Sequence, residues 1–203
     1  MRHFFAHMFD PGWTTSPASW IGLVWSVWAI SWIAAAIWSR QASARASFAQ
    51  EAPYRILTIV GIALLFGFVD VRAIPYGWDV RETVMWFLLA LVLAGFLFAW
   101  WARIHLGALW SGTIQRKQNH RIVDTGPYAL VRHPIYTGLL LAGFATAIAR
   151  GRWEALIGAA LFALGCWIKA RNEERFLSEE LGPEYAAFRK RVPMLIPRPW
   201  GRG

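Results

Sequence analysis

Five stretches of apolar residues, almost free of charge, constrain this chain more than any other feature of its sequence. They cover residues 20–38, 56–69, 84–102, 135–149 and 153–168. A helix of about 20 mostly apolar residues is long enough to cross the hydrocarbon core of a bilayer. The pattern therefore predicts an all-α integral membrane protein with about five transmembrane helices, the second of which extends over 54–74.

The composition agrees with a membrane protein. Only 16% of the 203 residues are charged and 57% are hydrophobic, whereas about a quarter of the residues in a soluble domain are charged. The 14 tryptophans suit the membrane–water interface, where the ring is buried and its N–H stays hydrated. The net charge is +9, and the charged residues lie mostly between the apolar stretches. We therefore expect the basic residues to face membrane lipids, and we expect no nucleic-acid partner.

The basic residues also predict how the chain crosses the membrane. Most of the 21 Lys and Arg residues fall on one side when the N-terminus is placed outside, and the positive-inside rule then makes the C-terminus cytoplasmic. The last two helices are joined only by residues 150–152, which predicts a short C-terminal helical hairpin. Four glycines are expected to let these two helices approach closely: Gly138, Gly143, Gly158 and Gly165.

We expect one structural domain with two parts. Residues 1–102 hold three N-terminal transmembrane helices, and residues 103–203 hold the polar motifs together with the last two helices. The polar segments 103–134 and 169–197 fall on the same side in this topology, so they are expected to form one cytoplasmic pocket. The single cysteine, Cys166, excludes an internal disulfide and a multi-cysteine metal site, and we expect no metal.

Chemically useful residues first gather where the chain meets the fourth apolar stretch. A Gly-Pro pair at 126–127 predicts a turn, and Pro134 suits the first turn of a helix, where its missing N–H is harmless. Arg132, His133 and Tyr136 then crowd the start of that helix, where free N–H groups and the helix dipole favour a carboxylate. The alternative is that Arg132 and His133 only mark the headgroup boundary.

A second polar cluster follows the fifth stretch and should continue its helix into the cytoplasm. It contains Lys169, Arg171, Glu173 and Glu174, of which Lys169 and Glu173 are spaced to share one helix face. Taken alone, the cluster also fits a solvated surface with weak ion pairs. A Gly-Pro pair at 182–183 predicts a turn into a further short helix.

The combination of these motifs is more specific than any one of them. A Gly-Pro-Tyr and Arg-His-Pro-x-Tyr segment leads into the predicted hairpin, which is followed by Glu-Glu, Gly-x-Glu-Tyr, Arg-Val-Pro and Ile-Pro. This order resembles the isoprenylcysteine carboxyl methyltransferase family, in the wider group that includes the phospholipid N-methyltransferases. The similarity spans roughly residues 100–197, and the first three helices match only as generic membrane helices.

The resemblance implies an S-adenosylmethionine-dependent membrane methyltransferase whose cofactor lies in a cytosolic pocket around the last two helices. Matched position by position, it assigns cofactor contacts to residues of both polar segments. They are Gln115, His120, Arg121, Ile122, Val123, Tyr128, His133, Pro134, Ile135, Tyr136, Glu173 and Glu174. Gln118 is the alternative to Gln115 because the loop lengths differ, and Glu174 is the alternative to Glu173 after a one-residue shift.

The resemblance also implies a lipophilic acceptor, a small molecule or a prenylated chain, which enters from the bilayer and presents a carboxylate. Where the family has an arginine that contacts substrate, this chain has Lys169, which keeps the charge but loses the bidentate fork. Arg171 is the other candidate, so Lys169, Arg171 and Glu173 form the expected catalytic set. A phospholipid amine or a thiol is the alternative acceptor, and an amine would need Glu173, Glu174 or His133 as its base.

Two other functions remain open from the sequence. Membrane sterol reductases, which use NADPH, carry a similar Arg-His-Pro and Glu-Glu arrangement, usually in larger chains with more spans. A non-catalytic scaffold or transport subunit is the second alternative. Such a subunit is expected to line a path through the membrane with charged residues inside its spans. In this chain Asp70 and Arg72 lie only near the end of the predicted second span.

Overall fold

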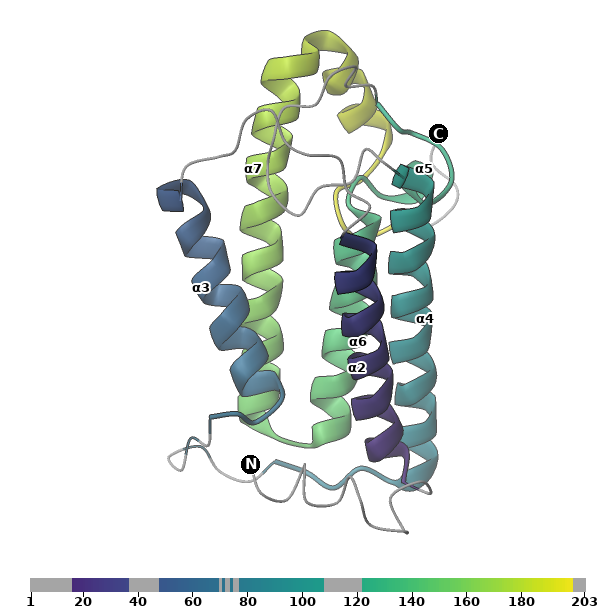
Figure 1. The fold of residues 1–203 in the computed structure, drawn as a ribbon, viewed down its shortest axis with the longest axis vertical. Helices are drawn as coiled ribbons and strands as arrows, with labels where there is room; N and C mark the ends of the chain where they lie inside the picture. The colour runs from purple at the N-terminus through teal and green to yellow at the C-terminus, as the bar shows by residue number, and fades with distance from the viewer. Residues whose placement is uncertain are drawn as a thin grey trace.

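The fold follows the apolar stretches, because each of them lies largely within one helix. The computed structural model describes residues 16–36, 48–69, 71, 74, 77–107 and 122–198. Its helices are α2 (Pro17–Ala36), α3 (Phe48–Leu65), α4 (Glu82–Leu106), α5 (Pro127–Leu130), α6 (Pro134–Arg150) and α7 (Trp153–Arg191). Figure 1 shows the long helices as one bundle with the short α5 at one end.

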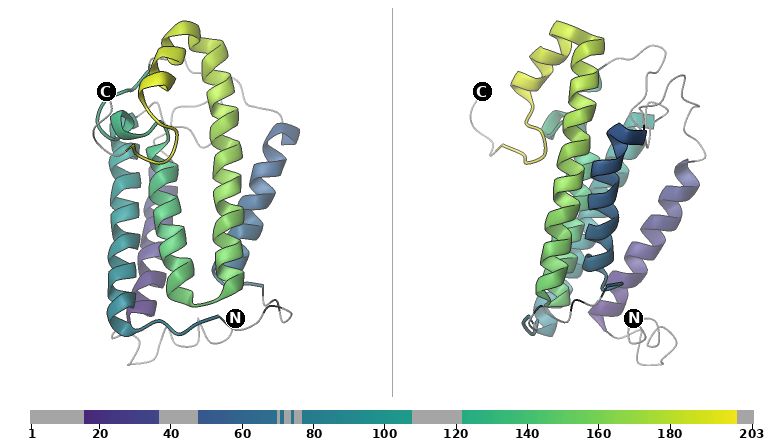
Figure 2. Two further views of the ribbon diagram at one scale, coloured as in Figure 1. Left: turned by 180° about the vertical axis from the view of Figure 1, so that it is seen from behind. Right: turned by 90° about the vertical axis from the view of Figure 1, so that its left-hand side faces the viewer.

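The long helices form two packed pairs. Helix α4 packs along α6, α3 packs along α7, and α2 lies against α4 (Figure 1 and Figure 2). Helix α6 ends at Gly151, which adopts a φ of 64°, a left-handed conformation that glycine takes without steric cost. Helix α7 then runs back in the opposite direction, so its distal part lies at the same end of the bundle as the start of α6.

Three of the described helices are long and apolar enough, by length and composition, to cross a membrane: α2, α4 and α7. Helix α6 is apolar but has only 17 residues. Helix α3 has 18 residues, and its first two turns carry Glu51 and Arg55. Large apolar side chains also point outward, and Ile33 and Leu97 are 70% and 71% exposed. These features support an integral membrane protein.

Helix α3 differs from the predicted second span at both ends. It begins at Phe48 and ends at Leu65, whereas the predicted helix covered 54–74. The helix ends because Gly67 adopts a φ of 68°, and the N–H groups of Gly67 and Phe68 donate to carbonyls of the last turns at 3.1 and 2.8 Å. The predicted end was therefore wrong, since the apolar composition continues past a glycine cap.

Glycines allow the helices of each pair to touch backbone to backbone. A Cβ built on Gly138 of α6 would lie 2.3 Å from the carbonyl oxygen of Gly95 in α4. A Cβ built on Gly158 of α7 would lie 2.6 Å from the carbonyl oxygen of Gly61 in α3. Neither position has room for a methyl group, so these contacts set how closely the helices pack.

The predicted role of the glycines in a contact between α6 and α7 was wrong for three of the four. Gly138 faces α4, and both Gly158 and Gly165 face α3. Only Gly143 faces α7, where its Cβ would lie at an ordinary 3.6 Å from the Phe162 ring. Small residues mark close helix approaches, but their spacing in the sequence does not show which neighbour approaches.

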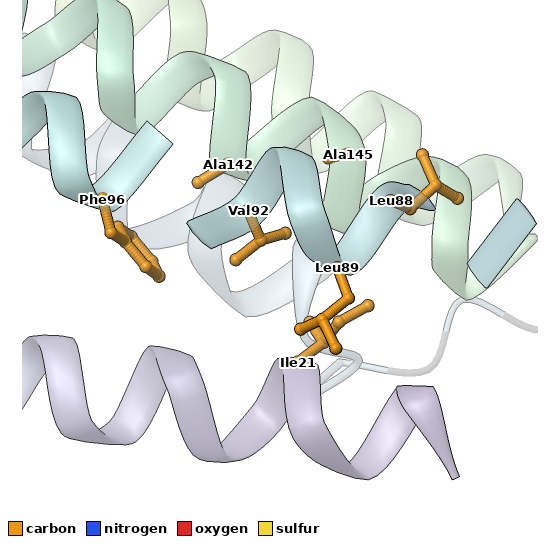
Figure 3. Close-up of a cluster of buried hydrophobic side chains, with 7 residues drawn as sticks. All are labelled: Ile21, Leu88, Leu89, Val92, Phe96, Ala142 and Ala145. Atoms are coloured by element: carbon orange, nitrogen blue, oxygen red, sulfur yellow. The ribbon is translucent and has the colours of Figure 1, made fainter. Parts of the chain in front are cut away.

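Helix α2 is held by aromatic packing around an apolar cluster. The buried members of this cluster are Ile21, Leu88, Leu89, Val92, Phe96, Ala142 and Ala145, contributed by α2, α4 and α6 (Figure 3). The Trp25 ring packs edge-on against Phe96, with ring centroids 4.7 Å apart, and its indole N–H donates to Thr146 Oγ1 at 2.9 Å. Trp25 therefore acts as a packing residue inside the bundle.

Replacing Gly138 with alanine is expected to destabilise the protein, because the new methyl group would overlap the Gly95 carbonyl. Overpacking of this kind costs about 1–3 kcal/mol. Gly143→Ala is the matched control on the same helix, since its methyl group fits and alanine favours a helix by about 0.5–1 kcal/mol. Thermal unfolding in detergent compares the two, and an unchanged midpoint for Gly138→Ala would contradict the close approach of α4 and α6.

Candidate active site

The candidate site lies where the start of α6, the distal part of α7 and the segment after α7 meet. Helix α7 bends at Gly182, whose φ is 52°, and ends at Arg191, so the chain turns back toward α6 (Figure 1). The N–H groups of Arg132 and His133 donate to the carbonyls of Pro193 and Met194 at 2.8 and 3.1 Å. The two polar segments are thus joined through their backbones.

A buried ion pair connects these segments through their side chains. Arg132 Nε donates to Glu174 Oε1 at 2.7 Å, and the two side chains are only 9% and 3% exposed. Arg132 also donates to the carbonyls of Val192 and Arg189, the latter at 3.2 Å. The desolvation cost of such a buried pair is recovered only when further hydrogen bonds satisfy both partners, and Arg132 makes several.

Glu173 forms a second contact between α7 and the start of α6. Tyr136 donates its hydroxyl to Glu173 Oε1 at 2.6 Å, and His133 Nδ1 lies 3.4 Å from Glu173 Oε2. The His133 and Tyr136 rings stack with centroids 5.6 Å apart. His133 Nε2 lies 3.4 Å from Glu174 Oε1, so the histidine stands between the two carboxylates.

The protonation of His133 is set by opposing effects. Its burial disfavours the charged ring and by itself lowers the pKa, but contacts with the carboxylates of Glu173 and Glu174 raise the pKa above its usual value. The two carboxylates thus favour the charged ring, and burial opposes it. Arg132, His133 and Lys169 together oppose the charges of Glu173 and Glu174.

Two buried polar atoms of this cluster lack a hydrogen-bond partner among the described residues. They are His133 Nε2 and Glu174 Oε2, the latter 3.6 Å from Arg189 Nε without forming a hydrogen bond. The first turn of α6 also lacks a side-chain cap, which leaves its N–H groups available to a ligand. Because buried polar atoms are usually paired, these atoms indicate where a polar ligand would bind.

Segment 122–131 forms one wall beside this cluster. Tyr128 is buried in α5, where burial raises the pKa of its hydroxyl above the usual value. His105, at the end of α4, stacks on the Tyr128 ring at 6.4 Å and shares a hydrogen bond with Thr125 Oγ1 at 2.9 Å. His105 was missed by the sequence analysis, although its position just beyond the third apolar stretch could have indicated it.

A second residue missed from the sequence is Arg103, which ties two helix ends together. Its guanidinium donates to the carbonyls of Ala35 in α2 and Gly107 after α4, both at 3.0 Å. The side chain is buried at the end of the bundle that carries the site. Arg103 therefore fixes α2 and α4 next to the site without being one of the predicted site residues.

The predicted catalytic residues separate in space. Lys169 points toward Tyr136 and toward Tyr54 of α3, with its Nζ 5.6 and 5.7 Å from the two ring centroids. Arg171 is exposed and lies over the ring of Trp167, 5.6 Å from its centroid. Lys169 thus faces the Glu173 cluster, whereas Arg171 lies on the outer surface of α7.

The predicted cofactor contacts fall into three groups. His133, Tyr136, Glu173 and Glu174 meet in one cluster, and Pro134 begins the α6 helix within it. The neighbouring predicted contacts are Ile135 in the first turn of α6, Tyr128 in α5, and Ile122 and Val123 before it, with Ile122 packed against the buried side chains after Gly182. The remainder lie outside the described residues: Gln115, Gln118, His120 and Arg121.

The residues present fit the chemical groups of S-adenosylmethionine, whose methionine part carries a carboxylate, an ammonium and a sulfonium. The uncapped start of α6 and the buried His133 Nε2 suit the carboxylate. The buried carboxylate of Glu174 and the half-buried carboxylate of Glu173 suit the ammonium and the sulfonium, which need negative charge nearby when desolvated. Glu174 Oε2, which lies 3.6 Å from Arg189 Nε but accepts no hydrogen bond among the described residues, is the observation that favours a cationic ligand here.

The fold and the contacts described above define a helical membrane protein with a cluster of charged side chains at one end of its bundle. Residues 88–179 match the model of the isoprenylcysteine carboxyl methyltransferase (ICMT) family. The match runs from α4 into α7 and includes the Arg132, His133 and Glu173 region. The match covers less than half of the chain, and it confirms the resemblance found in the motifs.

Several characterised proteins are similar to this chain. Methanethiol S-methyltransferase 2 of Bradyrhizobium diazoefficiens is 31% identical over 75% of this chain and 61% of its own length. Protein-S-isoprenylcysteine O-methyltransferase of Schizosaccharomyces pombe is 32% identical over 47% of this chain and 42% of its own length. Cobalt-zinc-cadmium resistance protein CzcN of Cupriavidus metallidurans is 32% identical over 70% of this chain and 61% of its own length. The chain thus spans between 42% and 61% of these relatives.

Proposed function

We propose that the protein is an S-adenosylmethionine-dependent methyltransferase that acts on a lipophilic acceptor at the membrane interface. The observation that carries this proposal is the cluster of His133, Tyr136, Glu173 and Glu174, which fits a zwitterionic, cationic cofactor. Similarity to an isoprenylcysteine O-methyltransferase and to a methanethiol S-methyltransferase supports methyl transfer as the reaction. It also supports an acceptor with an oxygen or sulfur nucleophile.

When bound, the cofactor would supply a methyl group already activated by the positive sulfur. The protein then has to bind the cofactor and the acceptor, orient them and exclude water. It need not provide a covalent nucleophile. Glu173, held by Tyr136 and His133, would place negative charge beside the cofactor. Glu174 and Arg132 would hold the two polar segments together around it.

The proposed position of the site relative to the membrane follows the predicted topology. Five membrane-crossing helices would put the N-terminus outside and the site in a cytoplasmic pocket. The water-soluble cofactor would then enter from the cytoplasm, and the lipophilic acceptor would enter sideways between helices. An acceptor that is a carboxylate or a thiol needs a cation to hold it, and Lys169 faces the cluster in which that cation would act.

Calorimetry on detergent-purified protein tests the cofactor assignment. The protein is expected to bind S-adenosylmethionine and its demethylated product, S-adenosylhomocysteine, with micromolar dissociation constants, because both share the carboxylate and ammonium that the cluster fits. NADPH is the control ligand, and it is expected not to bind. Folded protein that binds NADPH and neither adenosyl compound would contradict the proposal and favour a membrane reductase.

A further inference from the structure

His105 is a side chain at the site end of the bundle that none of the family-like motifs contains. Helix α4 continues past the apolar stretch 84–102 and ends at Leu106, so its last turn carries His105 beyond the apolar part of the bundle. The residue is exposed, yet its ring contacts the turn before α5 and a buried residue of α5 itself. These contacts connect α4 to the wall beside the charged cluster.

Three contacts attach the His105 ring to this wall. Its Nε2 shares a hydrogen bond with Thr125 Oγ1 at 2.9 Å. Gly126 adopts a φ of 57°, and a Cβ built on it would lie 2.8 Å from His105 Cε1. The ring also stacks on Tyr128, with an angle of 25° between the two planes. His105 therefore covers the side of the turn on which any residue other than glycine would place a side chain.

Tyr128 depends on such contacts because α5 is short. The helix has only four residues, too few to be stable without packing against its neighbours, which are α4 and α6. Tyr128 is 8% exposed. Burial raises the pKa of its hydroxyl, and the negative charge of Glu173 raises this pKa further. The charge of Glu173 thus reaches the Tyr128 hydroxyl, which agrees with a position beside the cluster.

We propose that His105 is a positioning residue of the methyltransferase site, which holds Tyr128 in place through the turn at 125–126. This inference rests on the proposed function, because it takes Tyr128 as part of the wall against which the cofactor binds. His105 itself touches no reacting group. It fixes the conformation of the wall before the cofactor arrives, so that less of the binding free energy is spent on ordering the wall.

The two properties of the imidazole can be separated by substitution. A histidine offers a flat ring for stacking and a ring nitrogen for the hydrogen bond to Thr125. His105→Phe keeps the ring and removes the hydrogen bond, whereas His105→Ala removes both. Because the residue is exposed, neither substitution is expected to unfold the bundle.

Calorimetric titration of S-adenosylhomocysteine into detergent-purified protein measures the effect. His105→Ala is expected to weaken binding about 10-fold, and His105→Phe about 3-fold. Ile104→Ala is the matched control, since Ile104 is the preceding residue of α4 and is 71% exposed. The control should bind like wild type, and all three variants should keep the wild-type midpoint of thermal unfolding. Wild-type affinity in His105→Ala would overturn the inference.

Thr125→Val tests whether the effect passes through the turn, because it removes the other partner of the hydrogen bond. It is expected to weaken binding by about as much as His105→Phe does. The double variant His105→Phe with Thr125→Val should bind no more weakly than either single variant, since both remove the same interaction. Losses that add in the double variant would show that the two residues act separately, and would overturn the proposed path.

Fluorine NMR of protein with fluorotyrosine in place of Tyr128 follows the wall directly. His105→Ala is expected to shift or broaden this signal in the free protein, and Ile104→Ala should leave it unchanged. Saturation with S-adenosylhomocysteine should shift the wild-type signal, and a signal that does not respond to the bound compound would overturn the place of Tyr128 in the wall. Failure of the wild-type protein to bind S-adenosylhomocysteine would instead contradict the proposed function, whereas the comparison of the free proteins does not depend on the cofactor.

Discussion

Arg132→Met is expected to lower the free energy of unfolding by about 3–5 kcal/mol, the largest effect on stability of any substitution in the site. Removing one partner of a buried ion pair leaves the other as an uncompensated charge. Glu174 is 3% exposed and receives its shortest contacts from Arg132. The substitution also removes the side-chain donors to the Val192 and Arg189 carbonyls, so the segment after α7 is held mainly by its backbone hydrogen bonds to residues 132 and 133.

Chemical unfolding in detergent measures this effect, and Arg189→Met is the matched control. Arg189 also approaches Glu174, at 3.6 Å, but its side chain is 43% exposed, so its contribution is screened by solvent. The control is expected to change stability little. The double variant Arg132→Met with Glu174→Leu should recover part of the loss, because no charge is then left buried. A single variant as stable as wild type would show that Arg132 does not hold the segments together.

Glu173→Gln is expected to reduce the affinity for S-adenosylmethionine by at least about 100-fold while the protein stays folded. Glutamine keeps the size of the side chain and can still accept the hydrogen bond from Tyr136. It removes the negative charge that opposes His133 and the cationic groups of the cofactor. Losing one partner of a desolvated charge contact costs about 2–5 kcal/mol, which corresponds to this change in affinity.

Calorimetric titration of S-adenosylmethionine into each variant checks this prediction. Glu179→Gln, an exposed glutamate on the same helix, is the matched control and is expected to bind like wild type. A similar loss in both variants would point to a general effect of net charge. Wild-type affinity in Glu173→Gln would remove Glu173 from the site and favour the one-residue shift to Glu174.

The sequence predicts the order of the long helices because apolar stretches of this length have few other stable environments. It failed at the end of α3, where Gly67 caps the helix inside a stretch that is still apolar. It also assigned the glycines to the wrong interface, because a small residue at a helix surface does not identify its neighbour. Gly138 and Gly158 each meet a helix that is distant in the sequence.

The site was partly predictable for a related reason. Pro134 marks the start of α6, and the Glu-Glu pair follows the last apolar stretch, so both motifs were assigned to one end of the bundle. That Arg132 pairs with Glu174, and His133 stands between the carboxylates, depends on side-chain geometry that spacing does not contain.

Transfer of labelled methyl groups is the most direct test of the central claim. Purified protein in lipid nanodiscs would be incubated with methyl-labelled S-adenosylmethionine and a panel of lipophilic thiols and carboxylic acids, alongside the Glu173→Gln variant. The account predicts label in an organic-extractable product with the wild-type protein and almost none with the variant. Folded wild-type protein that binds the cofactor yet labels no acceptor, or a variant as active as wild type, would contradict it.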